Sequence, residues 1–365
     1  MPASNEFVNT LKRIWESGDA AFPIDQRLPD MMKRGLVERF GASSVITADE
    51  TSKISDGKPV ESGDALVIAT SGSSGEQKGA VHTHDSIEAA ALATGAFLKC
   101  NASDHWLACI SLAHVGGMSV ITRALQFESA LSISTSVSQE IIDKAVADGA
   151  TLTSLVPTSV SSLNVSGFRQ VLVGGSKPFR ELPQNAVVTY GLTETFGGVV
   201  YNGDALDGVD VRLNSESEIE IMSRSLMRCY RNDPLADTFT SDGWFRTGDI
   251  GEFVESKLSV LGRRDELINT GGYKVWPKSV EQTVSSLESV ADCAVAGIAD
   301  EKWGSAVALW LVVAGNQKVS LDDIRNHVKK SMPDYCAPQK LFVVSQIPRT
   351  ALGKVRMSEL IAVVK

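Results

Sequence analysis

The amino-acid sequence predicts a two-domain α/β protein, with a large N-terminal α/β domain of parallel strands and a small, mobile C-terminal α+β domain. Length is the first reason, because 365 residues at roughly 150 per domain make room for two domains. Between residues 65 and 191, short apolar runs alternate with helical patterns and end in glycines, as in parallel sheets with ligand loops at the strand ends. The pattern of apolar and polar residues changes after residue 205, and a separate set of strands and helices follows. We therefore expect domains at 1–261 and 262–365.

Each expected element follows from the spacing of its apolar residues. Phe7, Leu11 and Ile14 recur at helical spacing, and a second helix is indicated by Met31, Met32 and Leu36. In the parallel part we expect strands at 65–69, 106–112, 151–156, 170–173 and 186–189, and helices at 86–97 (with Asp85 as N-cap) and 139–147. Alternating patterns predict half-exposed antiparallel strands at 209–213 and 218–222. In the last domain we expect strands at 294–298 and 308–313 and helices at 277–287 and 321–330.

Composition and charge exclude several classes of protein. With 43% hydrophobic and 22% charged residues, the chain is not intrinsically disordered. Its 35 Lys and Arg against 44 Asp and Glu give a net charge of −9, which argues against a general nucleic-acid binder. The 5 cysteines form no CxxC pair, so neither a disulfide framework nor a zinc site is expected. Without a signal-peptide pattern or a long apolar run, we expect a cytoplasmic protein with no integral membrane association.

A glycine- and serine-rich segment directly follows the first expected strand. Residues 70–79 read TSGSSGEQKG, in which backbone N–H groups and hydroxyls can surround an anion and Lys78 adds a positive charge. The segment is not a Walker A loop, because Gln77 precedes Lys78 where that motif needs glycine. Its glycines also do not fit the G-x-G-x-x-G dinucleotide pattern. We interpret it as a phosphate loop; the alternative is a flexible surface loop.

This segment is the first of five that occur in a familiar order. Residues 190–195 read YGLTET, 243–249 read GWFRTGD, 262–266 read GRRDE, and 348–354 read PRTALGK. Together the five resemble the motifs of the acyl-adenylate-forming superfamily, which includes acyl- and aryl-CoA synthetases, nonribosomal peptide adenylation domains and luciferases. The phosphate loop begins at Thr70, earlier than is usual in that superfamily, so we expect a shortened N-terminal scaffold.

The resemblance implies a reaction in two halves. A carboxylate attacks the α-phosphate of ATP to give an acyl-adenylate and pyrophosphate, and a thiol, usually that of coenzyme A, then displaces AMP. Tyr190 is expected to stack on adenine beside Gly175 and Gly191, whose missing side chains allow close approach. Asp249 and Arg263 are expected to hold the ribose. The implied nucleotide-binding set is Thr70, Ser71, Gly72, Ser73, Ser74, Gly75, Lys78, Gly174, Gly175, Tyr190, Gly191, Asp249 and Arg263.

The same resemblance assigns catalysis to three residues. Thr193 would donate its hydroxyl to the α-phosphate, and Glu194 would bind Mg²⁺, a cation that prefers oxygen ligands. Lys354 would bridge the attacking carboxylate and the α-phosphate, which repel each other. The superfamily rotates its small domain about an Asp at the hinge, here Asp265, and the Gly271-Gly272 face then serves thioester formation with coenzyme A.

The segment 112–123 bears on the identity of the acid. It resembles the corresponding stretch of o-succinylbenzoate–CoA ligases of menaquinone biosynthesis, where a His-x-x-Gly is followed by an Arg suited to a second carboxylate. Here His114, Gly117 and Arg123 occupy these substrate positions. An Arg in an apolar helix is costly unless it is paired, and a dianionic aromatic acid would supply the pair. The alternative is an arginine whose charged end reaches the surface.

Other interpretations stay open. Another small acyl- or aryl-CoA synthetase would use the same core chemistry, whereas a non-catalytic nucleotide-binding homologue would not need Lys354, Glu194 and Asp249 together. His82 and His84 lack a nearby third ligand, so we interpret them as structural. Expected partners are a carboxylic acid, ATP and coenzyme A, and not nucleic acid. The sequence leaves the oligomeric state open, for which a homodimer is the common default.

Overall fold

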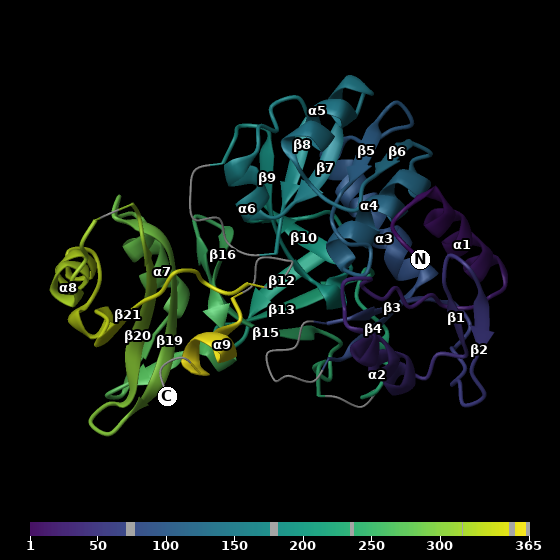
Figure 1. Cartoon of the computed structure of the whole chain (residues 1–365). Coiled ribbons are helices and arrows are strands. Elements are labelled where there is room, and N and C mark those ends of the chain that lie inside the picture. The colour runs from purple at the N-terminus through teal and green to yellow at the C-terminus, as the bar shows by residue number, and fades with distance from the viewer. Residues whose placement is uncertain (71–76, 176–181, 234–236, 316, 350–354, 363–365) are drawn as a thin grey trace. The chain divides into compact units, whose positions relative to one another are not determined.

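The structure is a computed structural model that describes residues 1–70, 77–175, 182–233, 237–315, 317–349 and 355–362 (Figure 1). The chain divides into two compact units, which are described separately. Unit 1 comprises Met1–Gly175, Glu181–Val211 and Ile221–Arg246, and unit 2 comprises Ser176–Arg180, Arg212–Glu220 and Thr247–Lys365. The expected domain boundary after Leu261 does not coincide with these divisions and stays a prediction.

The centre of unit 1 is a seven-stranded sheet of order β11-β10-β9-β8-β7-β5-β6 (Figure 1). Its strands are β5 (His105–Ala108), β6 (Ala130–Ile133), β7 (Leu152–Leu155), β8 (Gln170–Val173), β9 (Ala186–Leu192), β10 (Gly197–Tyr201) and β11 (Asp204–Ala205). From β6 through β5, β7 and β8 to β9, all neighbours are parallel, which confirms the predicted parallel sheet. β10 and β11 add antiparallel pairs, because the chain turns back tightly after β9.

Four helices accompany this sheet: α3 (His84–Leu98), α4 (Val115–Gln126), α5 (Gln139–Ala147) and α6 (Pro157–Ser162). α4 packs against α3 and against β5 and β7, and Ile142 of α5 is buried with Val171 and Val173 of β8. The prediction that Asp85 is the N-cap of this helix was wrong, because Thr83 caps α3. Its hydroxyl accepts from the Ser86 N–H at 3.1 Å, and the Ser86 hydroxyl accepts from the Thr83 N–H at 3.1 Å, which makes a capping box.

The first predicted strand does not belong to the parallel sheet. β3 (Asp64–Ala69) pairs antiparallel with β4 (Gly79–Thr83), and β14 (Cys229–Tyr230) completes a three-stranded sheet of order β14-β4-β3. β3 ends at Ala69 and β4 begins at Gly79, so the connection between them is shorter than the crossover of about a dozen residues that parallel strands need. The N-terminal part adds α1 (Asn5–Glu16), α2 (Asp30–Phe40), β1 (Ser44–Ile46) and β2 (Thr51–Lys53), and confirms both expected helices.

A four-stranded sheet has the order β12-β13-β15-β16, built from β12 (Val209–Leu213), β13 (Glu218–Ser223), β15 (Phe245–Val254) and β16 (Lys257–Arg263). The elements from Ile268 onward all lie in unit 2: β17 (Ile268–Thr270), β18 (Tyr273–Val275), α7 (Pro277–Ser285), β19 (Val290–Asp300), β20 (Gly304–Val313), α8 (Leu321–Lys329), β21 (Lys340–Val343) and α9 (Met357–Ala362). Val280 of α7, Leu309 of β20 and Ile324 of α8 are fully buried in one apolar cluster, so unit 2 has a core of its own. The α+β character expected near the C-terminus is confirmed.

Within the described parts of the chain, the longest helix is α3 with 15 residues. A helix that crosses a bilayer needs about 20 apolar residues. No described helix is long and apolar enough to span a membrane.

Candidate nucleotide and acid site

The glycine- and serine-rich segment is closed at its base by the β3–β4 hairpin. Ala69 and Gly79 are register partners at the end of the ladder. Beyond them, the Thr70 N–H donates to the Lys78 carbonyl at 2.7 Å, and the Lys78 N–H donates to the Thr70 hydroxyl at 3.3 Å. The two ends of the segment are thus held side by side. Five expected phosphate contacts lie outside the described residues and stay predictions: Ser71, Gly72, Ser73, Ser74 and Gly75.

The second expected motif forms the end of β9 and the turn after it. Tyr190 and Gly191 lie on β9, whereas Thr193 and Glu194 belong to a short 3-10 helix, η1 (Thr193–Thr195). The Thr195 hydroxyl fastens this turn by donating to the carbonyl two residues later at 2.6 Å. Glu194 is 9% exposed, an unusual environment for a carboxylate. Tyr190 is half-buried, so part of its side chain is accessible to a ligand.

His82 supports this turn from strand β4. Its Nε2 lies 2.8 Å from the Thr193 carbonyl oxygen, so the ring donates through Nε2, and the side chain is completely buried. Burial lowers the pKa of His82 to about 4, although the hydrogen bond with Thr193 acts in the other direction. A neutral ring that positions a backbone carbonyl agrees with the structural interpretation of His82.

Tyr230, which the sequence analysis did not single out, contacts the same glutamate. Its hydroxyl donates to Glu194 Oε1 at 2.6 Å, and the two side chains are buried. Tyr230 lies on β14, 36 residues from Glu194 in sequence. No local pattern marks such a residue, because the contact depends on the pairing of β14 with β4.

Two glycines of the site have no room for a side chain within the protein itself. A Cβ at Gly191 would lie 1.9 Å from the Gly197 carbonyl oxygen, so the backbone of β10 takes the place of a side chain there. A Cβ at Gly174 would lie 2.7 Å from the Thr189 hydroxyl oxygen. The close approach at Gly191 is therefore between two strands. Gly175 adopts a φ of +94°, a conformation that favours glycine, and its place beside adenine stays a prediction.

The three residues expected to meet the acid lie at the start and along the length of α4. His114 is the N-cap of this helix, and its Nε2 lies 3.7 Å from Asp25 Oδ2. A hydrogen bond from Arg27 is the main reason that the pKa of Asp25 falls to about 2. A Cβ at Gly117 would lie 2.4 Å from the Ser111 carbonyl oxygen, so only glycine lets α4 begin so close to the loop that follows β5.

Arg123 is buried rather than extended to the surface. Its exposure is 3%, and its guanidinium lies over the Trp106 ring with Cζ 5.7 Å from the centroid. Its Nε has no hydrogen-bond partner among the described residues. A Cβ built on Gly197 would lie 3.8 Å from Arg123 Nη2, which places this cation beside the turn that carries Glu194. A buried guanidinium with an unmet donor is well suited to an anionic ligand.

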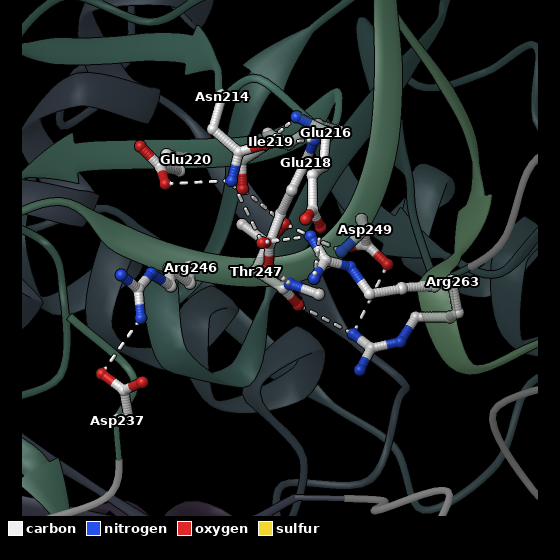
Figure 2. A network of polar contacts seen from close by, with 12 residues as sticks. Asn214, Glu216, Glu218, Ile219, Glu220, Asp237, Arg246, Thr247, Asp249 and Arg263 are labelled. Carbon is white, nitrogen blue, oxygen red and sulfur yellow. Dashed lines mark hydrogen bonds and ion pairs between the residues drawn. The ribbon is translucent and has the colours of Figure 1, made fainter. Parts of the chain in front are cut away.

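In unit 2, Asp249 and Arg263 face each other across the β15–β16 pair (Figure 2). Asp249 is 7% exposed, and Arg263 Nη1 lies 3.4 Å from its Oδ1 and donates to the Thr247 carbonyl at 2.9 Å. Burial opposes the charged form of Arg263, but the charges of Asp249 and Asp265 raise its pKa. A carboxylate such as that of Asp249 can accept hydrogen bonds from a diol, as a ribose contact requires.

Around this pair, a polar network fixes the GWFRTGD turn (Figure 2). The Thr247 hydroxyl donates to the Ile219 carbonyl at 2.7 Å, and the Gly248 N–H donates to Glu218 Oε1 at 2.9 Å. Arg264 Nη2 donates to the other oxygen of Glu218 at 2.7 Å. Glu218 is 6% exposed, and both of its carboxylate oxygens accept hydrogen bonds.

The remaining predicted residues are placed or lie outside the described chain. Asp265 is half exposed in a short 3-10 helix after β16, and its Oδ1 lies 3.5 Å from Arg263 Nε. Gly271 and Gly272 form the turn between β17 and β18, both with positive φ. Lys354 lies outside the described residues, and its expected role stays a prediction.

The side chains of unit 1 fit a magnesium ion held partly by a substrate. Among the described residues, no group of three or more His, Cys, Asp or Glu side chains is placed to hold a metal. Magnesium is commonly bound by one or two protein carboxylates together with phosphate oxygens and water. Glu194 offers a carboxylate of which one oxygen accepts from Tyr230, so its other oxygen would serve as the ligand.

Comparisons with known proteins agree with this geometry. Residues 23–219 match the model of AMP-binding enzymes, and residues 279–354 match that of the AMP-binding enzyme C-terminal domain. A protein named probable 2-succinylbenzoate–CoA ligase from Mycobacterium tuberculosis is 33% identical over 330 residues, which cover 84% of this chain and 86% of that protein. The protein named long-chain-fatty-acid–CoA ligase FadD13 from the same species is 31% identical over 80% of this chain and 65% of its own length.

The fold is also found among solved structures. The o-succinylbenzoate CoA synthetase (MenE) from Bacillus subtilis, in complex with the acyl-adenylate intermediate OSB-AMP, superposes with a TM-score of 0.86. The match covers 98% of this chain and 86% of that one at 23% sequence identity. At this identity the likeness concerns the fold, and it confirms the predicted α/β class with a smaller C-terminal part.

Proposed function

We propose a function on one premise: this chain belongs to the AMP-binding enzyme family. It is an ATP-dependent, AMP-forming acid–CoA ligase. In the first half-reaction a carboxylate attacks the α-phosphate of ATP, which forms an acyl-adenylate and releases pyrophosphate. In the second half-reaction the thiol of coenzyme A attacks the acyl carbon and AMP leaves. The acid is o-succinylbenzoate, and the formation of its thioester is a step of menaquinone biosynthesis.

Arg123 is the residue that supports o-succinylbenzoate as the acid. An uncompensated buried guanidinium is strongly destabilising, whereas one that pairs with a carboxylate regains much of that free energy. Arg123 has a cation–π contact and an unpartnered Nε, so the protein alone does not satisfy it among the described residues. A substrate with a second carboxylate beside the reacting one would complete the pair. o-Succinylbenzoate has such a second carboxylate, and the name of the M. tuberculosis relative supports this choice.

In the first half-reaction, the chain has to hold two anions together. Lys78 and the hydroxyls of the segment 70–75 bind the β- and γ-phosphates, and Thr193 donates to the α-phosphate. Glu194 holds a magnesium ion, which when bound neutralises phosphate charge. Lys354 contacts the attacking carboxylate and the α-phosphate, and so offsets their mutual repulsion.

The nucleoside and the second half-reaction use other residues. Tyr190 stacks on adenine next to Gly175 and Gly191, and the ribose hydroxyls bind Asp249 and Arg263. Residues 262–365 form a domain that rotates about Asp265 relative to 1–261, and the Gly271-Gly272 turn lies against coenzyme A during thioester formation. The rotation explains how Lys354 acts in one step while this turn acts in the other.

A fatty acid is the second candidate substrate, because a relative named long-chain-fatty-acid–CoA ligase is nearly as similar. A monocarboxylic acid leaves Arg123 without a counter-charge, so we favour the diacid. We also propose the cytoplasm as the location. All five cysteines are free thiols, three of them buried, as is usual in a reducing compartment.

Exchange of labelled pyrophosphate into ATP tests the proposal directly. We expect exchange that depends on o-succinylbenzoate, exceeds that with benzoate or a fatty acid, and is lost in Lys354→Ala. The same variant should still convert preformed acyl-adenylate and coenzyme A to thioester, because the lysine acts only on the first half-reaction.

Lys318→Ala is the matched control, since this exposed lysine lies in the same unit and no role is proposed for it. If none of the carboxylic acids in a broad panel supports exchange, the ligase function is contradicted. Exchange with benzoate or fatty acids but not with o-succinylbenzoate contradicts the substrate and leaves the chemistry standing.

A further inference from the structure

Residues 226–233, here called the Tyr230 segment, are fastened along β4. Within it, the Arg228 N–H donates to the Val81 carbonyl at 2.8 Å, and the Arg231 N–H donates to the Gly79 carbonyl at 2.7 Å. Gly79 is the last residue of the phosphate loop and the first residue of β4. The segment therefore runs beside the strand that leaves this loop, although about 150 residues separate them in sequence.

Two arginine side chains hold the segment on both sides of Tyr230. Arg228 makes a bidentate pair with the buried Asp64, with both N–O distances at 2.9 Å, and a further contact with Glu61 at 2.8 Å. The hydrogen bond with Asp64 is the main cause that raises the pKa of Arg228. Arg231 donates to three backbone carbonyls, those of Lys58, Pro59 and Phe40, at 2.6, 2.8 and 3.2 Å. Bidentate arginine contacts fix geometry as well as charge.

Tyr230 points from this fixed segment toward Glu194. Its hydroxyl donates to Glu194 Oε1 at 2.6 Å, a short distance typical of an O–H bond to an ionised acceptor. The segment also binds the main chain of the same residue, because the Met227 N–H donates to the Glu194 carbonyl at 2.7 Å. Both the backbone and the side chain of Glu194 are thus held from the Tyr230 segment.

The ring of Tyr230 faces the phosphate loop at the same time. Lys78 Nζ lies 4.7 Å from the ring centroid, within the range of a cation–π contact, and 3.5 Å from Asp233 Oδ2. One tyrosine therefore touches the lysine at the end of the phosphate loop and the glutamate expected to bind the metal. A tyrosine that only filled the core would need neither polar contact.

We propose that Tyr230 is a positioning residue for the adenylation step: its hydroxyl fixes the orientation of Glu194, so that the second carboxylate oxygen is available to the magnesium ion of the nucleotide. The inference rests on the proposed function in that it concerns the metal–ATP complex used in the first half-reaction. Groups that orient a metal ligand commonly change metal affinity about 10- to 100-fold when they are removed. Tyr230→Phe keeps the ring, its packing and the contact with Lys78, and removes only the hydroxyl.

Titration calorimetry of ATP binding at a series of Mg²⁺ concentrations tests the proposal without acid or coenzyme A. In Tyr230→Phe we expect the Mg²⁺ concentration for half-maximal enhancement of ATP binding to rise about 10-fold. The affinity for metal-free ATP should not change. Tyr201→Phe is the matched control, because this buried tyrosine also has a hydroxyl partner, Thr94 at 3.0 Å, and should leave the Mg²⁺ dependence unchanged.

A double-mutant cycle with Glu194→Gln identifies the route of the effect. If Tyr230 acts through Glu194, the double variant should bind Mg²⁺–ATP no more weakly than Glu194→Gln alone. An unchanged Mg²⁺ dependence in Tyr230→Phe overturns the proposal, and so does an additive loss in the double variant. Metal-dependent ATP binding without exchange on any acid would contradict the proposed ligase function but leave this inference to be decided by the cycle.

Discussion

At the scale of single residues, Arg123 shows how the free-energy cost of burying a charged side chain indicates a ligand. A guanidinium at 3% exposure has lost most of its hydration, and the Trp106 ring replaces only part of it. The same side chain in a purely structural role would be expected to meet a carboxylate of the protein, as Arg228 meets Asp64. The absence of a partner for Arg123 Nε among the described residues is the feature that separates a ligand contact from a core ion pair.

We expect Arg123→Ala to reduce selection for the diacid rather than catalysis in general. For o-succinylbenzoate, kcat/KM in pyrophosphate exchange should fall by roughly 30-fold, equivalent to about 2 kcal/mol for a lost buried charge contact. For 4-oxo-4-phenylbutanoate, which lacks the ring carboxylate, it should change little. The ratio of the two values is the measurement, since any general loss of activity cancels in it.

Arg13→Ala serves as the control for removal of a positive charge from unit 1, because Arg13 forms an exposed pair with Glu6. It should leave the ratio of the two acids unchanged. An Arg123→Ala enzyme that folds and still discriminates between the acids as the parent does would remove Arg123 from the substrate site.

At the scale of elements, the β9–β10 pair determines where the turn with Thr193 and Glu194 lies. β9 carries Tyr190 and Gly191, and the chain reverses through η1 before β10 begins at Gly197. The reversal is so tight that the two backbones meet where a side chain of Gly191 would lie. The positions of Thr193 and Glu194 therefore depend on the absence of a side chain at Gly191.

Gly191→Ala should separate these strands and disturb the turn. The added Cβ would lie 1.9 Å from a backbone oxygen, so we expect a loss of about 3 kcal/mol in the free energy of unfolding. Gly35→Ala is the matched control, since Gly35 lies inside α2 with no atom within 4 Å of an added Cβ, and should stabilise by about 0.5–1 kcal/mol. Urea denaturation midpoints should thus shift in opposite directions; a Gly191→Ala midpoint equal to that of the parent would contradict the packing described.

The elements also show what the sequence could predict. Helix α5 and strand β8 have the predicted bounds, because a strong apolar period and clear breakers delimit them. The prediction that the strand at 65–69 belongs to the parallel sheet was wrong, since an apolar run looks the same in parallel and antiparallel sheets. The sequence did not indicate Tyr230 for a related reason: its contact with Glu194 depends on β14, a strand of two residues with no pattern of its own.

At the scale of the whole molecule, the turn proposed for the second half-reaction lies in a different unit from Glu194. Unit 1 contains Glu194, Lys78 and Arg123 around its own sheets, and unit 2 contains the Gly271-Gly272 turn on a separate core. In the proposed mechanism these groups act in different half-reactions. A substitution confined to the turn should therefore slow thioester formation and leave adenylation unchanged.

Gly272→Leu tests this separation. An added Cβ there meets no described atom within 4 Å, so the leucine would project from the turn toward the place proposed for coenzyme A. We expect normal pyrophosphate exchange, but at least about 10-fold slower conversion of preformed acyl-adenylate and coenzyme A to thioester, corresponding to about 1.4 kcal/mol in the barrier. Gly315→Leu is the matched control, because Gly315 also has a positive φ and open space, and so shares the backbone strain of about 1–2 kcal/mol. Equal rates of thioester formation in the two variants, or a parallel loss of exchange in Gly272→Leu, would show that the turn does not serve the second half-reaction alone.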